Sequence, residues 1–183
     1  MSKSYPVEKV ISGEGSLGVM TATLRKFHVG HLALSDGAFP YVIPVNHTYS
    51  DGKLIIHCAL TGKKIDIIRR NSAACYGVYA PDDGVLAFNG ANSAIRSCQK
   101  NYESVVCYGH ARLVDDLRER RRYLGVFARD YAHADLKHAE EETCHCIVFD
   151  ILEMTGRYAF NPKPKVIYYY AFTESGINSP YLG

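Results

Sequence analysis

Hydrophobic and polar residues alternate with a period of two along much of the chain, a pattern typical of β-strands. Three such runs follow one another closely, at residues 28–35, 40–49 and 53–58. The breaks between them, Asp-Gly-Ala-Phe at 36–39 and Ser-Asp-Gly at 50–52, suit hairpin turns. The pattern therefore predicts an antiparallel meander of three strands.

Further strand-like runs predict strands at 74–80, 102–113 and 144–157. The first is closed by a turn at 81–84, and the second is interrupted by a bulge at Gly109. The sequence also predicts three helices. Two are expected at 18–27 and 62–70. The third follows Asp115 and Asp116, and its apolar positions recur at helical spacing: Leu117, Leu124, Phe127 and Tyr131. This order predicts a mainly β fold, a small antiparallel β-barrel with flanking helices packed outside it.

Two prolines bracket the second run of the meander, at Pro40 and Pro44. Proline has no N–H to donate to a strand ladder. We therefore expect this strand to be irregular, or to leave some of its backbone groups free for another partner such as a ligand.

The composition narrows the possible functions. A chain of 183 residues, 47% apolar and 22% charged, is long enough to bury one core, so we expect a single domain over residues 1–183. Its 21 basic and 19 acidic residues are too evenly balanced for a nucleic-acid-binding surface. The chain has neither a signal peptide pattern nor an apolar run of about 18 residues, which predicts a cytoplasmic protein without a membrane partner.

Six cysteines are present, and in a cytosolic chain we expect them to be reduced thiols. Cys144 and Cys146 form the only close pair, with His145 between them. A structural zinc site needs a second ligand pair at suitable spacing, which the chain lacks. We therefore expect no metal site.

The predicted helix at 62–70 carries two cations at an unfavourable end. Thr61 is placed to cap it, and Lys63 and Lys64 fall in its first turn. A cation at a helix N-terminus costs about 0.3 to 1 kcal/mol. Either the two lysines and the unpaired N–H groups together bind a phosphate dianion, or both side chains extend into solvent. This stretch alone leaves both interpretations open.

Three segments of the chain, residues 30–37, 40–71 and 102–114, resemble in order and spacing the FMN-binding split-barrel proteins related to pyridoxamine 5′-phosphate oxidase. The similarity extends in particular to their nitroimidazole-resistance branch. It covers a core of about residues 28–153 and leaves outside it an N-terminal extension and a tyrosine-rich tail that includes Tyr168 to Tyr170.

The resemblance implies a homodimer with two FMN molecules in its interface. It places one strand segment along the isoalloxazine ring. It places a strand end and the helix start that follows at the phosphate. Ser104 and Glu103 lie beside the dimer interface in this comparison. Cys58 stands where relatives commonly carry a serine or threonine, and Thr61 could supply the missing hydroxyl. The implied cofactor-binding residues are Ile43, Pro44, Val45, Asn46, His57, Cys58, Thr61, Lys63, Lys64 and Ser104.

The resemblance also implies an oxidoreductase in which FMN passes electrons from a reduced donor to a small acceptor, such as a nitroaromatic compound. Because flavin carries the redox chemistry, no acid, base or nucleophile is obligatory, and we assign no catalytic residue. The chain lacks the C-terminal arginine and histidine cluster of true pyridoxamine-phosphate oxidases, which argues against that activity. A non-catalytic flavin carrier or sensor, and a barrel that binds haem or a deazaflavin, remain as alternatives.

Overall fold

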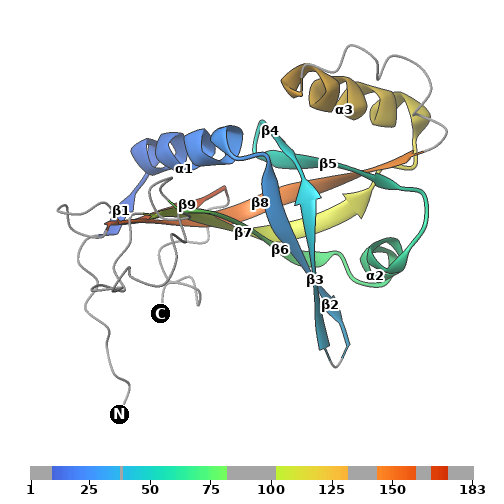
Figure 1. The fold of residues 1–183 in the computed structure, drawn as a ribbon, viewed down its shortest axis with the longest axis horizontal. Coiled ribbons are helices and arrows are strands. Elements are labelled where there is room, and N and C mark those ends of the chain that lie inside the picture. Colours follow the sequence, from blue (N-terminus) through green and yellow to red (C-terminus); the bar gives the residue numbers. More distant parts are fainter. Residues whose placement is uncertain (1–9, 38, 82–101, 132–143, 160–165, 173–183) are drawn as a thin grey trace, which may run out of the picture.

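The computed structural model describes residues 10–37, 39–81, 102–131, 144–159 and 166–172, which form nine strands and three helices (Figure 1). The strands are β1 Val10–Ser12, β2 Val29–Asp36, β3 Phe39–Asn46, β4 Thr48–Ser50, β5 Lys53–Ala59, β6 Ala73–Pro81, β7 Tyr102–Leu113, β8 Cys144–Ala159 and β9 Val166–Ala171. The helices are α1 Glu14–Lys26, α2 Lys63–Arg70 and α3 Leu117–Asp130.

The strands form one curled sheet in the order β1-β9-β8-β7-β6-β2-β3. The long strand β8 pairs with β7 on one edge, and its other edge is shared by β5 and β9. The strands β3, β2, β6, β7, β8 and β5 thus make an antiparallel barrel that stays open between β3 and β5. This confirms the predicted antiparallel split barrel, apart from the parallel pair of β1 and β9.

The predicted three-strand meander is only partly correct. Strands β2 and β3 pair antiparallel around a turn at Gly37, and Asp51 and Gly52 have the positive φ angles of a tight turn, 48° and 75°. The second predicted strand, however, breaks at His47 into β3 and β4, and β5 pairs with β4 and β8 instead of β3. At the break, the His47 side chain is fully buried and the His47 N–H makes a 2.9 Å bond to the His28 carbonyl, after which the chain pairs with β5.

Two hydrophobic clusters hold the fold together. The larger fills the barrel and includes Met20 and Leu24 from α1, while the smaller lies under α3 around Tyr123 and Phe127. The first half of β8 lies between the two clusters, so residues 144–149 are buried on both faces. Burial on both faces explains why this stretch is apolar without alternation.

The helix predictions are correct in number and differ at the ends. Helix α1 begins at Glu14, before the predicted residue 18, and α2 agrees with the prediction. The expectation that Thr61 caps α2 is wrong, because the capping residue is Gly62 and no side chain caps the helix. The N-cap of α3 is Asp116, whose carboxylate accepts a 2.7 Å bond from the Glu119 N–H.

Two further details bear on the sequence predictions. The bulge at Gly109 is confirmed by a register shift, and a Cβ there would collide with the carbonyl of Asp150. The tyrosine run 168–170 is not a tail but part of β9, and β1 was missed because it is only three residues long. The predicted turn at 81–84 and Cys98 fall largely or wholly outside the described residues. No helix in the described ranges is long and apolar enough to cross a membrane.

Candidate functional site

A pocket of about 450 Å³ lies where the barrel is open, between β3 and the end of β5. Strand β3 supplies one wall, the C-terminal end of β5 supplies the other, and α2 contributes a single cation at the rim. The lining residues are Val29, Ile43, Pro44, Val45, Asn46, His57, Cys58 and Lys64. The structure therefore brings together most of the residues that the sequence predicted for a cofactor.

The backbone of β3 presents polar groups towards this opening. The His47 N–H donates to the His28 carbonyl at 2.9 Å and so points at β2. Backbone direction alternates along a strand, so the N–H and C=O of Asn46 and the C=O of Pro44 point away from β2. Among the described strands, β3 pairs only with β2. The two prolines are thus located where a missing N–H breaks no ladder bond, in agreement with the sequence prediction.

The opposite wall carries a neutral thiol beside a cation. Cys58 is buried, and burial raises the pKa of its thiol to about 11, while the nearby Lys64 ammonium acts in the opposite direction. Lys64 is half-buried at the start of α2. With so high a pKa, Cys58 acts as a weak hydrogen-bonding group and not as a nucleophile.

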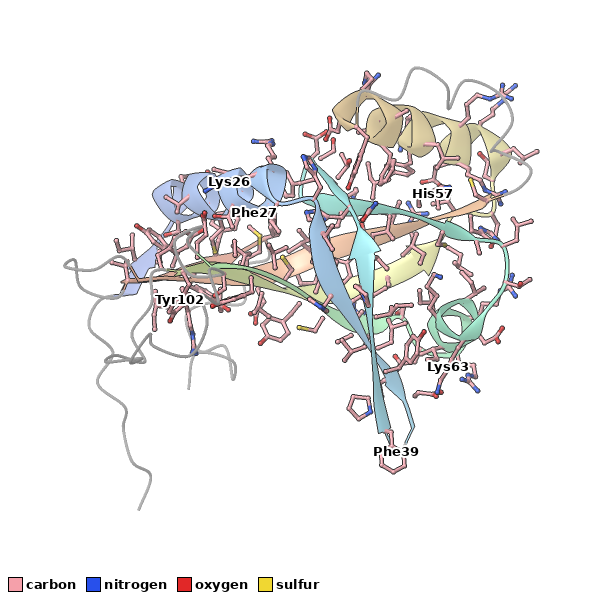
Figure 2. All side chains as sticks on the ribbon, in the orientation of Figure 1. Lys26, Phe27, Phe39, His57, Lys63 and Tyr102 are labelled. Carbon is pink, nitrogen blue, oxygen red and sulfur yellow. The ribbon has the colours of Figure 1, made fainter. Side chains whose placement is uncertain are left out.

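His57 lies on the other face of β5 and reaches the pocket from the side of α3 (Figure 2). Its ring centroid is 5.9 Å from that of Phe127. The side chain is largely exposed, so it is accessible to a ligand in the pocket. The imidazole at the rim can therefore contact a molecule in the pocket.

Lys63, in contrast, turns towards the β2–β3 hairpin and does not line the pocket (Figure 2). Its ammonium is 2.9 Å from the Asp36 carboxylate and 5.2 Å from the centroid of Tyr41. Arg70 binds the other oxygen of Asp36 at 2.9 Å. The hydrogen bond from Lys63 is the main cause of the lowered pKa of Asp36. An ion pair therefore offsets the unfavourable position of Lys63, and only Lys64 faces the pocket.

Two other predicted residues do not line the pocket of this chain. Thr61 is exposed in the loop before α2. Ser104 lies on β7, directly opposite Tyr79 on β6 and Arg157 on β8. Glu103, which the resemblance placed near the cofactor, points to the other face, where it accepts bonds from Thr23 at 3.0 Å and Lys26 at 2.6 Å.

Val29 is a lining residue that the sequence interpretation missed. It begins β2 directly opposite Asn46. The hairpin turn pairs Asp36 with Phe39, and counting back along both strands from that pair reaches Val29 and Asn46. The predicted turn was therefore a sufficient signal to find it.

Among the described residues, Cys144, His145 and Cys146 belong to no candidate metal-binding cluster. The part of the chain that the structure describes contains no cluster of three or more His, Cys, Asp or Glu side chains able to hold a metal ion. The five described cysteines are free thiols, and all but Cys75 are buried.

Solved structures with the same fold include several cofactor-binding proteins. A candidate 5-nitroimidazole antibiotic resistance protein from Bacteroides thetaiotaomicron is 21% identical, with a TM-score of 0.62 over 76% of this chain and 81% of its own. An FAD-binding protein from Mesorhizobium loti is 23% identical, with a TM-score of 0.59 over 78% and 94%. The flavocytochrome Anf3 from Azotobacter vinelandii is 16% identical, with a TM-score of 0.63 over 88% and 79%. Likeness at this level of identity establishes the shared split-barrel fold.

No functionally curated protein matches the chain significantly. The sequence model of the pyridoxamine 5′-phosphate oxidase family, however, matches residues 19–158. This range extends from within α1 almost to the end of β8, and it includes every residue that lines the pocket. The chain therefore belongs to the pyridoxamine 5′-phosphate oxidase family.

Proposed function

We propose that this protein is a flavoprotein that binds FMN between β3 and β5 and acts as an oxidoreductase, passing electrons from a reduced donor to a small acceptor such as a nitroaromatic compound. One observation carries the proposal: the same pocket combines an unpaired strand edge, apolar side chains and a single cation at a helix start. Proteins of the same fold that bind FAD, or are described as a flavocytochrome, support it.

The residues present fit each part of FMN. The N–H of Asn46 and the C=O of Pro44 supply the donor and acceptor that the pyrimidine edge of the ring requires, and Val29, Ile43 and Val45 supply apolar contacts. Helix α2 has no side-chain cap, so its first N–H groups and the Lys64 ammonium suit a phosphate. When bound, the flavin supplies the redox chemistry. The chain orients the ring through Asn46 and holds the phosphate through Lys64.

The proposal includes a homodimer formed through the open face of the sheet. Residues directly opposite each other on neighbouring strands point to the same face of the sheet. We call the more exposed of its two faces the outer face. The outer face is at least partly exposed and mostly apolar, which is typical of an interaction surface. It contains Ala33, Val42, Pro44, Cys75, Gly77, Tyr79, Val106 and Tyr108, together with the polar residues His31 and Ser104. Ser104 on this face would approach the flavin of the partner subunit, as the family resemblance implies.

An absorption spectrum and an FMN titration test the proposal. We expect protein purified without added cofactor to show flavin bands, or to acquire them when FMN is added. A Soret band would instead indicate haem, and a blue-shifted peak a deazaflavin. Protein that takes up no flavin at all would refute the proposal.

The two lysines provide a matched pair of variants. Lys64→Ala should raise the dissociation constant for FMN about tenfold to a hundredfold, because a hydrogen bond to a charged group contributes roughly 1.5 to 3 kcal/mol. Lys63→Ala removes the same charge one residue away, but its partner is Asp36. It should change the dissociation constant by less than about threefold. Equal losses in both variants would contradict the assignment of the phosphate to Lys64.

Turnover distinguishes an oxidoreductase from a flavin carrier. Under anaerobic conditions, a reduced nicotinamide donor should bleach the flavin bands, and a nitroaromatic acceptor should restore them with the nitro group reduced. Bound flavin that no donor reduces and no acceptor reoxidises would favour the carrier or sensor.

A further inference from the structure

The ladder between β2 and β3 ends one residue beyond the pocket. Val29 and Asn46 line the pocket and face each other across the two strands. The next pair is His28 and His47, joined by the 2.9 Å bond from the His47 N–H to the His28 carbonyl. After His47 the chain leaves β2 and begins β4. The position of Asn46 therefore depends on this last pair.

Tyr131, at the C-terminal end of α3, binds both residues of that pair. Its hydroxyl is 3.0 Å from the His28 carbonyl oxygen and 3.0 Å from the His47 carbonyl oxygen. Burial raises the pKa of Tyr131 to about 12, so the hydroxyl keeps its proton and acts as a donor. One side chain thus joins the ends of both strands.

Aromatic packing fixes the direction of this hydroxyl. The Tyr131 ring stacks on Phe127 with centroids 4.4 Å apart and an interplanar angle of 14°. The Tyr131 ring also contacts the His28 ring, with centroids 5.0 Å apart and an interplanar angle of 54°. Phe127 in turn is anchored in the cluster beneath α3 and contacts His57 at the pocket rim. The hydroxyl is therefore held by the helix and not by β3 itself.

The last pair of an edge strand would otherwise be weakly held. Strand ends open more readily than strand centres, and β3 has one partner strand among the described elements. Opening of the His28–His47 pair would displace the outward N–H and C=O of Asn46. Those are the groups assigned above to the ring of the cofactor.

We infer that Tyr131 is a positioning residue for the cofactor pocket: its hydroxyl holds the last pair of the β2–β3 ladder and so sets the position of Asn46. This inference rests on the proposed flavin site. By thermodynamic linkage, a ligand bound to Asn46 must also stabilise the end of α3.

Tyr131→Phe tests the inference, because it removes the hydroxyl and retains the stacked ring. Tyr158→Phe is the matched control, since Tyr158 also has a buried hydroxyl, 2.6 Å from Thr23, and does not line the pocket. Both variants should lose similar thermal stability. Only Tyr131→Phe should raise the dissociation constant for FMN, by about three- to tenfold, measured well below either melting temperature.

Hydrogen exchange on the wild-type protein provides a second measurement that needs no variant. FMN should slow the exchange of amides at the end of α3, around Tyr131, relative to those of α1, and Tyr131→Phe should abolish that difference. Equal FMN affinity in the two tyrosine variants, or an unchanged exchange rate at the end of α3, would overturn the inference while leaving the flavin site intact. Wild-type protein that takes up no flavin would overturn the proposed function and this inference together.

Discussion

At the scale of single residues, two adjacent lysines have different surroundings. Lys63 and Lys64 are adjacent, but one binds Asp36 on the hairpin and the other lines the pocket. A charge pattern cannot separate them, because the distinction depends on which side of α2 faces the hairpin. The resemblance pointed to a helix start that lies at the pocket rim, and the tertiary fold decides that Lys64 and not Lys63 faces the pocket.

His47, to which we assign no catalytic role, is fixed beside the end of the pocket strand β3 by two buried hydrogen bonds. Its imidazole is fully buried, 2.9 Å from the Leu24 carbonyl through Nε2 and 2.6 Å from the Tyr76 hydroxyl through Nδ1. A carbonyl can only accept, so Nε2 carries the proton and Nδ1 accepts from Tyr76. His47 is therefore neutral in this arrangement, and a second proton would reverse the Tyr76 bond and leave the Val45 carbonyl, at 3.4 Å, as the acceptor for the Tyr76 hydroxyl.

This arrangement predicts a pH-dependent stability. Burial lowers the pKa of His47 from 6.5 to about 4 in the folded protein. Between these values the unfolded chain binds the proton and the folded chain does not, so this contribution is fully present above about pH 6.5 and is lost as the pH falls towards 4. The loss should reach about 3 kcal/mol of unfolding free energy in denaturant titrations.

The variant His47→Gln should remove that part of the pH dependence, although it also lowers the overall stability. His110→Gln, at an exposed position on β7, should retain it. Parallel pH profiles for wild type and His47→Gln would show that another group is responsible.

At the scale of elements, the strands that could be predicted are those whose partners are close in the sequence. The β2–β3 hairpin follows from its alternation and turn, and its register even locates Val29. Strand β5 was found, but its pairing with β8 was not, because the partners lie almost a hundred residues apart and no local signal joins them. The free backbone groups of β3 could be predicted because Pro40 and Pro44 cannot donate to a strand ladder. Tyr131 was missed as a site residue because its link to His28 and His47 exists only after α3 packs.

A substitution at Gly30 tests how tightly β2 packs against Tyr76 of β6. A Cβ at this position would collide with the ring and hydroxyl of Tyr76, the residue that binds His47. Gly30→Ala should therefore destabilise the protein by about 1 to 3 kcal/mol, the usual range for overpacking a core. Gly77, which lies on β6 opposite His31 and so on the other face of the sheet, has open space around a Cβ. Gly77→Ala should change the unfolding free energy by less than about 1 kcal/mol in urea titrations.

If Gly30→Ala is as stable as Gly77→Ala, then Tyr76 can move aside, and the His47–Tyr76 bond is less constrained than the packing suggests. If Gly30→Ala instead loses stability but still binds FMN, then the fold depends on the His47–Tyr76 bond and the pocket does not.

At the scale of the whole molecule, the proposed interface and the proposed pocket share one strand. Pro44 lines the pocket and also belongs to the outer face. Association through this face would cover the barrel opening and bring the Ser104 of one subunit towards the pocket of the other. Assembly and cofactor binding should therefore depend on each other.

The assembly can be tested at one exposed apolar residue. Val42 is 55% exposed on the outer face, and Leu117 is 59% exposed on α3. The wild-type chain of 20.4 kDa should elute with the light-scattering mass of a dimer. Val42→Glu should yield monomers and weaken FMN binding, because a charge buried in an interface without a partner is strongly unfavourable. Leu117→Glu should leave both mass and affinity unchanged, and a monomeric wild type would refute this interface.

The two prolines of β3 have a consequence for solubility. An exposed strand edge invites a strand from another molecule, which is a common route to aggregation. On the outward edge of β3, Pro40 and Pro44 offer carbonyls without N–H groups, so an incoming strand would find every second donor missing. A small heterocycle that needs only one donor and one acceptor loses nothing. The same edge is therefore suited to admit the proposed small ligand and to disfavour pairing with a polypeptide strand.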